Sequence, residues 1–406
     1  MIPVYYDETN EVWKKANTSN LDKNNPWYSY NKAGEYKGMW ANAVTVKDTN
    51  RQTYLNAEPG TTISMDDITT MWVWIPRFNA VTPSNYNGGT KDNPGAINVT
   101  FVKANETAID AFTFGNKSLS GFWYAKFETS HTTLTASTTD NNLGCSNESC
   151  SNANGIIIKP NVISLGYNNI SNFFYASRSM EQSGNSFGFV KDEVDTHMSK
   201  NNEWGAVAYL TQSIHGRCTN STTCSEVYIN NSRGFYTGRS GGAAGKTPIN
   251  ETYTEQTSTY NYNTYGFYTY DDYLLNYNTN TKGNKVKGKG TGASTTGTIY
   301  GIYDMSGGTF EYVMGVYNRT INKSGFSSFP DTKYYNNYTG TTYTGHALTE
   351  TSGWYSDIAS FVESEFSWVG RGGDSTDSIS AGVFGYTGGF GAAADIVSNH
   401  FVITNE

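Results

Sequence analysis

The sequence predicts an α+β fold, built mostly from short β-strands with two helices grouped in the middle of the chain. Apolar runs bounded by proline and polar residues predict the strands, and two segments with helical spacing predict the helices. Composition supports the same class, because aromatic residues make up 15% of the 406 residues while charged residues make up only 16%. Aromatic side chains bury large apolar areas, so the chain can form an extensive core.

The strand predictions begin with residues 1–65, which we expect to form short strands and turns around the core residues Trp13, Trp27 and Trp40. Residues 70–76 form a dense apolar run that ends at a proline, which is typical of a strand. Residues 121–128 alternate in part between apolar and polar side chains, which predicts another strand.

The two helix predictions cover residues 171–182 and 196–214. The first begins at Ser171, a residue type that often caps helices, and the second ends at Gly216, in a position typical of a helix C-cap. The second predicted helix has one face at helical spacing, made by Trp204, Val207, Ala208 and Thr211.

Residues 230–300 are polar and rich in glycine and tyrosine, so we expect a long set of inserted loops there. Within it, residues 241–247 lack the glycine spacing of a phosphate-binding loop, so nucleotide binding is not expected. The net charge of −8 argues against a nucleic-acid partner, which needs clustered basic residues. No apolar run is long enough to span a membrane.

The four cysteines form two close pairs in polar, turn-rich segments, Cys145 with Cys150 and Cys218 with Cys224. The spacing does not fit a zinc site, which favours two local disulfides and an oxidising, extracytoplasmic setting. The alternative is four free thiols.

Catalytic and metal signatures are weak. The five histidines include no His-x-x-x-His pair, and no Gly-x-Ser-x-Gly elbow appears in a strand-to-helix context. The adjacent pairs Asp66–Asp67 and Asp271–Asp272 fit solvated turns better than acid–base catalysis. We expect no cofactor, with calcium at loop carboxylates and carbonyls as the open alternative.

Four segments, in order, resemble the formylglycine-generating-enzyme branch of the C-type lectin fold, also called the sulfatase-modifying-factor family. Residues 301–313 are similar to the family's "G-L-Y-D-M-x-G-N-V-W-E-W-V", although Gly308 replaces its asparagine and Phe310 and Tyr312 replace its tryptophans. The other three segments are residues 71–76, 122–129 and 201–208, and Arg371-Gly372-Gly373 follows them. The resemblance implies a C-type lectin fold of this subtype over residues 70–406, with residues 1–69 as a β-rich N-terminal extension or small domain.

The oxidase of that family needs a cysteine pair near its C-terminus, and this chain has no cysteine after Cys224. We therefore expect a protein that is not an enzyme. The same fold is used without catalysis by the variable proteins of diversity-generating retroelements, in which adenine-directed mutagenesis rewrites codons near the C-terminus. Residues 369–405 resemble such a variable region. The start Ile2-Pro3-Val4-Tyr5-Tyr6-Asp7 also resembles surface proteins of gut Firmicutes.

Residue types give a separate indication of diversification. Mutation of the first two bases of an AAC or AAT codon never yields Lys, Glu, Gln, Met or Trp. Residues 369–405 form a run of 37 without any of these five types, and the next comparable run, residues 257–281, has 25. The longer run falls on the segment that resembles a variable region.

The leading hypothesis is a non-catalytic binding protein that displays a diversified C-terminal surface toward an unknown protein or surface ligand. Tyr386 and Phe390 are the expected affinity anchors, since aromatic residues dominate interface hot spots. The alternatives are a structural surface or phage tail protein, and an enzyme of the sulfatase-modifying-factor type that works without the usual cysteines. The expected ligand-binding residues lie within 374–380 and 386–396: Ser375, Thr376, Ser378, Ile379, Tyr386, Thr387, Phe390, Asp395 and Ile396.

The expected location is extracellular or on the bacterial cell surface, with a virion tail as the alternative. We expect that an export or anchoring segment is missing from these 406 residues.

Overall fold

The larger of two main β-sheets contains seven strands in the order β12-β18-β9-β4-β3-β1-β2. The structure is a computed structural model that describes residues 1–19, 27–135, 140–230, 232, 234–239 and 291–405. The predicted loop set at 230–300 therefore lies largely outside the described residues. The strands of this sheet are β1 (Ile2–Asp7), β2 (Val12–Lys15), β3 (Asn42–Val46), β4 (Ile68–Pro76), β9 (Gly121–Ala125), β12 (Val194–Met198) and β18 (Phe401–Asn405).

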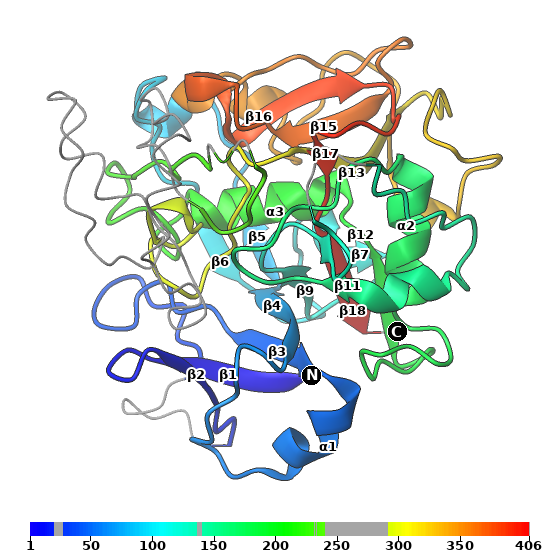
Figure 1. Cartoon of the computed structure of the whole chain (residues 1–406). Helices are drawn as coiled ribbons and strands as arrows, with labels where there is room; N and C mark the ends of the chain where they lie inside the picture. The colour runs from blue at the N-terminus through cyan, green and yellow to red at the C-terminus, as the bar shows by residue number, and fades with distance from the viewer. Residues whose placement is uncertain (20–26, 136–139, 231, 233, 240–290, 406) are drawn as a thin grey trace, which may run out of the picture.

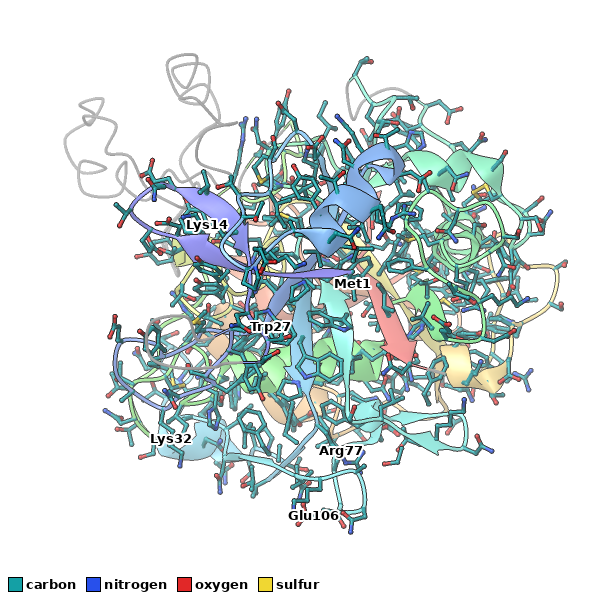
Figure 2. All side chains as sticks on the ribbon, turned by 90° about the horizontal axis from the view of Figure 1, so that it is seen from below. Met1, Lys14, Trp27, Lys32, Arg77 and Glu106 are labelled. Carbon is teal, nitrogen blue, oxygen red and sulfur yellow. A yellow bond between two sulfur atoms is a disulfide. The ribbon has the colours of Figure 1, made fainter. Side chains whose placement is uncertain are left out.

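Residues 1–69 contribute strands to the same sheet as the rest of the chain. β3 pairs antiparallel with β4, with Val44 opposite Met71, and β1 pairs with β3. β1 has alternating burial, whereas six of the nine residues of β4 are buried, four of them consecutive, because β4 is central and covered on both faces. Trp27 also contacts this sheet. Its Nε1 donates to the carbonyl of Asn42 in β3 (3.0 Å), and its side chain lies against the sheet in Figure 2.

The second main sheet has the order β14-β13-β15-β16, and β17 adds to β13. β13 pairs antiparallel with β15 and parallel with β14 and β17. Figure 1 shows β15 and β16 on the opposite side of the molecule from β1 and β2. The strands are β13 (Phe310–Tyr317), β14 (Asn336–Tyr338), β15 (Trp368–Gly372), β16 (Gly382–Gly389) and β17 (Val397–Ser398).

Helix α3 (Asn201–Thr211) runs between the two sheets, and every one of its residues is buried (Figure 1). Its side chains pack with Val73 and Tyr124 of the large sheet and with Val313 and Val369 of the second sheet. A helix with one apolar face would leave the other face in water. The predicted face around Trp204 is therefore only part of the contact, since both sides of α3 are covered.

The predicted start of this helix is wrong. Residues 196–198 belong to β12, where Met198 pairs with Phe401, and α3 begins only at Asn201. The end also differs, since the C-cap is Gln212 and Gly216 lies in a later turn. The side chains of β12 are mostly buried on both faces, which hides the alternation that marks a strand.

Helix α2 (Ile170–Ser179) confirms the first helix prediction, with a shifted start and end. Asn169, rather than Ser171, is the N-cap, and its side-chain oxygen accepts the backbone N–H of Asn172 at 3.0 Å. Helix α1 (Asp48–Asn56) was not expected. It has no buried residue, so its sequence carries no apolar stripe that could predict it.

Smaller elements connect the sheets. Three two-stranded ribbons pair β5 (Phe78–Ala80) with β6 (Val99–Phe101), β7 (Thr113–Phe114) with β8 (Lys117–Ser118), and β10 (Ser130–His131) with β11 (Ile156–Ile157). Single turns of 3₁₀-helix are η1 (Asn85–Gly88), η2 (Asp110–Phe112), η3 (Ser151–Gly155), η6 (Thr291–Ala293), η7 (Thr332–Tyr334), η8 (Thr349–Thr351), η9 (Trp354–Ser356) and η10 (Ser378–Ser380). The described residues therefore form a β-rich fold with few helices.

Candidate functional site

The predicted variable region, residues 369–405, contains four strands that lie in different parts of the core. β15 and β16 pair antiparallel, so that Trp368 lies opposite Gly389 and Arg371 opposite Tyr386. β17 lies beside β13, and β18 inserts between β12 and β9 of the large sheet. The parts of the region that are not buried are segments between these strands, the last three residues of β16, and Asn405.

Arg371 forms part of the support beneath the region. Its guanidinium is fully buried, donates from Nη2 to the Ala347 carbonyl (2.9 Å), and stacks over the rings of Trp204 and Tyr386. Burial lowers the pKa of Arg371 to about 10. Truncation here would remove packing as well as charge, so Arg371 is a scaffold residue.

His400 is buried in the same way, next to Glu311 of β13. Its Nδ1 contacts the Glu311 carboxyl group, and burial lowers the pKa of His400 to about 4. Burial also raises the pKa of Glu311. The imidazole is therefore neutral at pH 7, and it fills the interior at the start of β18 without facing solvent.

One end of the β15–β16 pair carries the residues predicted within 374–380. Ser375 is buried, and its backbone N–H donates to the Gly308 carbonyl at 2.9 Å. Thr376 is exposed and donates to the Asp374 carboxylate from both its N–H and its hydroxyl. Ile379 exposes 43% of its surface. Ser378 lies in η10, beside them in sequence.

The segment before β17 reaches the same end of the second sheet. The Ile396 carbonyl accepts the Phe310 N–H at 2.7 Å, two residues after the Gly308 carbonyl that Ser375 contacts. Ile396 exposes 40% of its surface, and Asp395 is partly exposed. Main-chain hydrogen bonds to Gly308 and Phe310 thus bring together two groups of predicted ligand-binding residues, one within 374–380 and the other at 395–396.

Gly308 allows this close approach. Its φ is +79°, and a Cβ at this position would lie 2.7 Å from Oε1 of Glu128. The structure gives a steric reason for glycine, because the buried Glu128 carboxyl group fills the space that a side chain would need.

Phe390 lies at the opposite end of β16, away from the 374–380 segment. It is partly buried, its ring lies 4.7 Å from that of Phe366, and the Lys323 ammonium lies 4.7 Å from its ring centroid. Thr387 is partly exposed and pairs with Gly370. Sequence reasoning missed Phe366 and Lys323, which lie outside 369–405 and approach Phe390 only through the tertiary fold.

Tyr386 differs from the expectation that it is an exposed anchor. It is 5% exposed, with its ring against Phe361 and the Arg371 guanidinium. Its main chain also exchanges hydrogen bonds with Ile358 and Ser360, which cover the outer edge of β16. Tyr386 and Ser375 therefore belong to the scaffold.

Both predicted disulfides are present, Cys145–Cys150 and Cys218–Cys224. Disulfides persist in oxidising environments, which supports an extracytoplasmic setting. Within the described ranges, no three His, Cys, Asp or Glu side chains gather as a metal-ligand group. In the same part of the chain, no helix is long and apolar enough to cross a bilayer.

Comparisons with known proteins leave the family open. No protein-family model matches the chain, and no curated protein matches it. Among solved structures, the chain is similar to Treponema denticola variable protein 1, with 11% sequence identity, a TM-score of 0.31, and coverage of 84% of this chain and 97% of that chain. A likeness at this score does not establish a shared fold or function.

Proposed function

We propose that this chain is a non-catalytic ligand-binding protein that presents a diversified surface formed by residues of 369–405. The scaffold would be of the C-type lectin type, in the formylglycine-generating-enzyme-like subtype that the sequence motifs resemble. The ligand would be a protein or a surface molecule, and the protein would act outside the cytoplasm, in keeping with its two disulfides.

One observation carries this proposal: residues 369–405 contain both buried side chains that support the fold and exposed side chains that could contact a ligand. Arg371, Tyr386 and His400 are buried in the core, whereas Thr376, Ile379 and Ile396 are exposed. Exposed apolar side chains on a rigid core are a common form of binding surface. The absence of five residue types from 369–405 supports diversification of the same segment.

The surface has two parts. The first part contains Thr376, Ile379, Asp395 and Ile396, and the second contains Thr387 and Phe390. Phe390 replaces Tyr386 as the expected aromatic anchor, because its ring is partly accessible and packs on Phe366. Rigid aromatic side chains give contact area at low entropic cost.

A display library tests this proposal without knowledge of the natural ligand. Thr376, Ile379, Phe390, Asp395 and Ile396 would be randomised together and selected against hen lysozyme as an arbitrary target. We expect most members to fold and selection to yield binders of micromolar affinity or better. A matched library at the buried positions Val383, Tyr386 and Val397 should lose folded protein. Equal loss of folded protein in both libraries would refute the proposal.

A further inference from the structure

The three partly exposed tryptophans of the chain lie together on one face of the large sheet. Of the nine tryptophans, six are buried, whereas Trp27, Trp74 and Trp123 are partly exposed. Trp74 and Trp123 lie opposite each other in β4 and β9, with ring centroids 5.3 Å apart, and the ring of Trp27 lies 6.2 Å from that of Trp123. Tyr28, which is 42% exposed, follows with its ring 6.0 Å from that of Trp27. We call these four side chains the aromatic face.

The aromatic face points away from α3 and from the proposed binding surface. Val73 and Tyr124, the strand neighbours of Trp74 and Trp123, pack against α3. Successive side chains of a strand point to opposite faces, so the two tryptophans lie on the other side of the sheet. Figure 2 looks onto this side, with Trp27 near the centre, whereas β15 and β16 lie beyond α3 (Figure 1).

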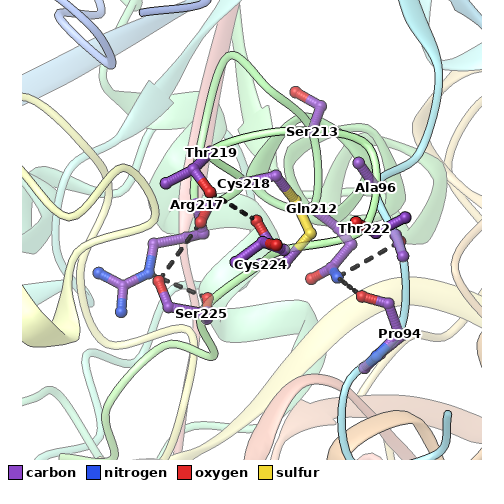
Figure 3. Close-up of a disulfide and its surroundings, with 12 residues drawn as sticks. Pro94, Ala96, Gln212, Ser213, Arg217, Cys218, Thr219, Thr222, Cys224 and Ser225 are labelled. Atoms are coloured by element: carbon purple, nitrogen blue, oxygen red, sulfur yellow. Dashed lines mark hydrogen bonds between the residues drawn. A yellow bond between two sulfur atoms is a disulfide. The ribbon is translucent and has the colours of Figure 1, made fainter. Parts of the chain in front are cut away.

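Buried contacts hold residues 27–30 against the sheet. The Tyr30 hydroxyl donates to the Trp74 carbonyl at 2.6 Å, and Nδ1 of His215 donates to the Tyr30 carbonyl at 2.7 Å. The Cys218–Cys224 disulfide closes the loop that follows His215 (Figure 3). The rings are therefore in place before a ligand binds, which lowers the entropic cost of binding.

The indole groups of the aromatic face offer hydrogen-bond donors. Among the described residues, the N–H groups of Trp74 and Trp123 have no hydrogen-bond partner, and each reaches the surface. The Tyr28 hydroxyl also has no partner in that part of the chain. An indole nitrogen donates and does not accept. A purely apolar ligand would leave these groups unpaired, so the face fits a ligand that combines apolar surface with acceptors.

We propose that the aromatic face binds a proline-rich polypeptide segment in the polyproline II conformation. Such a segment offers acceptors and few donors, because proline has no backbone N–H and this conformation leaves the carbonyls without internal hydrogen bonds. The indole N–H groups of Trp74 and Trp123 match those carbonyls. The proline rings would pack on the aromatic rings, as in other aromatic surfaces that recognise proline-rich segments.

The arrangement of the rings also fits this ligand. The planes of Trp27 and Tyr28 are inclined by 75°, and those of Trp74 and Trp123 by 56°, so the rings form facets rather than a flat platform. A polyproline II helix has three residues per turn and presents successive side chains in different directions. It can therefore place different prolines on different facets.

Other ligand classes match the aromatic face less well. A glycan carries hydroxyl groups that donate as well as accept, and the indole N–H groups satisfy only acceptors. A nucleic acid would bring its phosphates to a chain with a net charge of −8. The inference does not depend on the proposed binding surface of residues 369–405.

Fluorescence polarisation of a fluorescein-labelled decaproline peptide tests the proposal with the full chain. We expect a Kd of about 0.1 mM, and binding of a labelled Gly-Ser decamer that is weaker by about tenfold or more, because that peptide is flexible and has no proline rings. Absence of decaproline binding, or equal binding of the two peptides, would overturn the proposal.

Variants locate the binding on the aromatic face. Tyr28→Ala removes an exposed ring and should weaken decaproline binding by about fivefold, with a Tm within about 2 °C of the wild type. Trp123→Phe keeps a ring but removes the N–H donor, and should weaken binding by about threefold. Tyr343→Ala, at a position that is 39% exposed and outside the aromatic face, is the matched control and should bind as the wild type does. Unchanged binding by both Tyr28→Ala and Trp123→Phe would contradict the proposal.

Three further measurements with the wild type and Tyr28→Ala identify a different occupant. Titrations with cellohexaose and with phosphatidylcholine vesicles test a glycan and a lipid surface, and sedimentation velocity tests a second copy of the chain. We expect no binding of either probe at the aromatic face and no dimer that depends on Tyr28. Glycan binding, vesicle binding or a dimer that is present in the wild type and lost in Tyr28→Ala would overturn the proposal.

Discussion

Tyr386 and Phe390 lie four residues apart in the sequence, yet their surroundings differ. Tyr386 is 5% exposed and packs against Phe361 and Arg371, whereas Phe390 is partly exposed and packs against Phe366. The ring of Tyr386 therefore contributes to the core. The ring of Phe390 is available to contribute to a binding surface.

The stability of two alanine variants checks this difference. Tyr386→Ala should lower the free energy of unfolding by about 3–5 kcal/mol, because it leaves a cavity in the core. Phe390→Ala should cost less than about 1.5 kcal/mol, since part of its ring is already in water. Urea denaturation of both variants measures the two losses. A larger loss for Phe390→Ala would contradict the assignment of Tyr386 to the scaffold.

His197 is held between two buried carboxylates, with Nδ1 at 2.9 Å from Asp195 and Nε2 at 3.0 Å from Glu203. Burial alone would lower the pKa of His197, but Glu203 and Asp195 outweigh burial and raise it. Arg178 also pairs with Asp195 at 2.8 Å. This buried network joins β12, α2 and the first turn of α3.

The raised pKa of His197 gives a pH dependence with a defined sign. Its contribution to stability is complete below the ordinary histidine pKa of about 6.5, and it is lost as pH rises through the raised folded-state pKa. His197→Gln should cost about 2–4 kcal/mol at pH 6, and the cost should fall toward alkaline pH.

Urea unfolding of the wild type and His197→Gln across pH 5.5–10 measures this difference. His131→Gln is the control, because the ring nitrogens of His131 bond to the Thr133 hydroxyl and the Asn152 carbonyl, which carry no charge. A cost for His197→Gln that grows with pH would show that the imidazole is neutral in the folded state.

At the scale of the element, α3 is the helix that both sheets cover. Gly205 allows its closest approach to another segment, since a Cβ there would lie 2.6 Å from the carbonyl carbon of His346. The same segment supplies the Ala347 carbonyl that accepts from Arg371. The position of α3 thus determines how the 346–347 segment supports β15.

Gly205→Ala tests this contact through the sign of its effect. Glycine to alanine within a helix normally stabilises by up to about 1 kcal/mol. Here we expect a loss of about 1–3 kcal/mol, because the added methyl group meets backbone atoms that do not move freely. Thr53→Ala in the exposed helix α1 is the control and should give a small gain. Chemical denaturation measures both, and a gain for Gly205→Ala would contradict the contact.

Elements with a strong local signal were predictable from the sequence. The apolar runs at 70–76 and 121–128 correspond to β4 and β9, although β9 ends at Ala125, and the helix predicted at 171–182 corresponds to α2. The cysteine spacing also predicted both disulfides. In each case, residues close together in the sequence carry the information.

The remaining elements depend on tertiary contacts. Burial on both faces conceals the alternation of β12, so the predicted helix at 196–214 wrongly included part of this strand, and α1 has no buried residue. Tyr386 was predicted to be exposed because a strand pattern alone does not show that residues 358–360 cover the outer edge of β16. The division of 369–405 into buried and exposed residues therefore needed the structure.

At the scale of the whole molecule, the C-terminal residues serve two purposes. β18 lies inside the seven-stranded sheet, between β12 and β9, so the last strand is needed for the fold. Between the buried strands, short segments carry Thr376, Ile379 and Ile396 to the surface. If the gene segment is diversified, variation has to avoid the strands and concentrate on those short segments.

The DNA flanking the gene tests whether residues 369–405 are diversified. We expect a nearby reverse-transcriptase gene and a second copy of the codons for 369–405, differing from the gene only where that copy has adenine. The differing codons should encode exposed positions such as Thr376, Ile379 and Ile396, and should spare Arg371, Tyr386 and His400. The absence of a second copy, or differences concentrated at the buried positions, would contradict the claim.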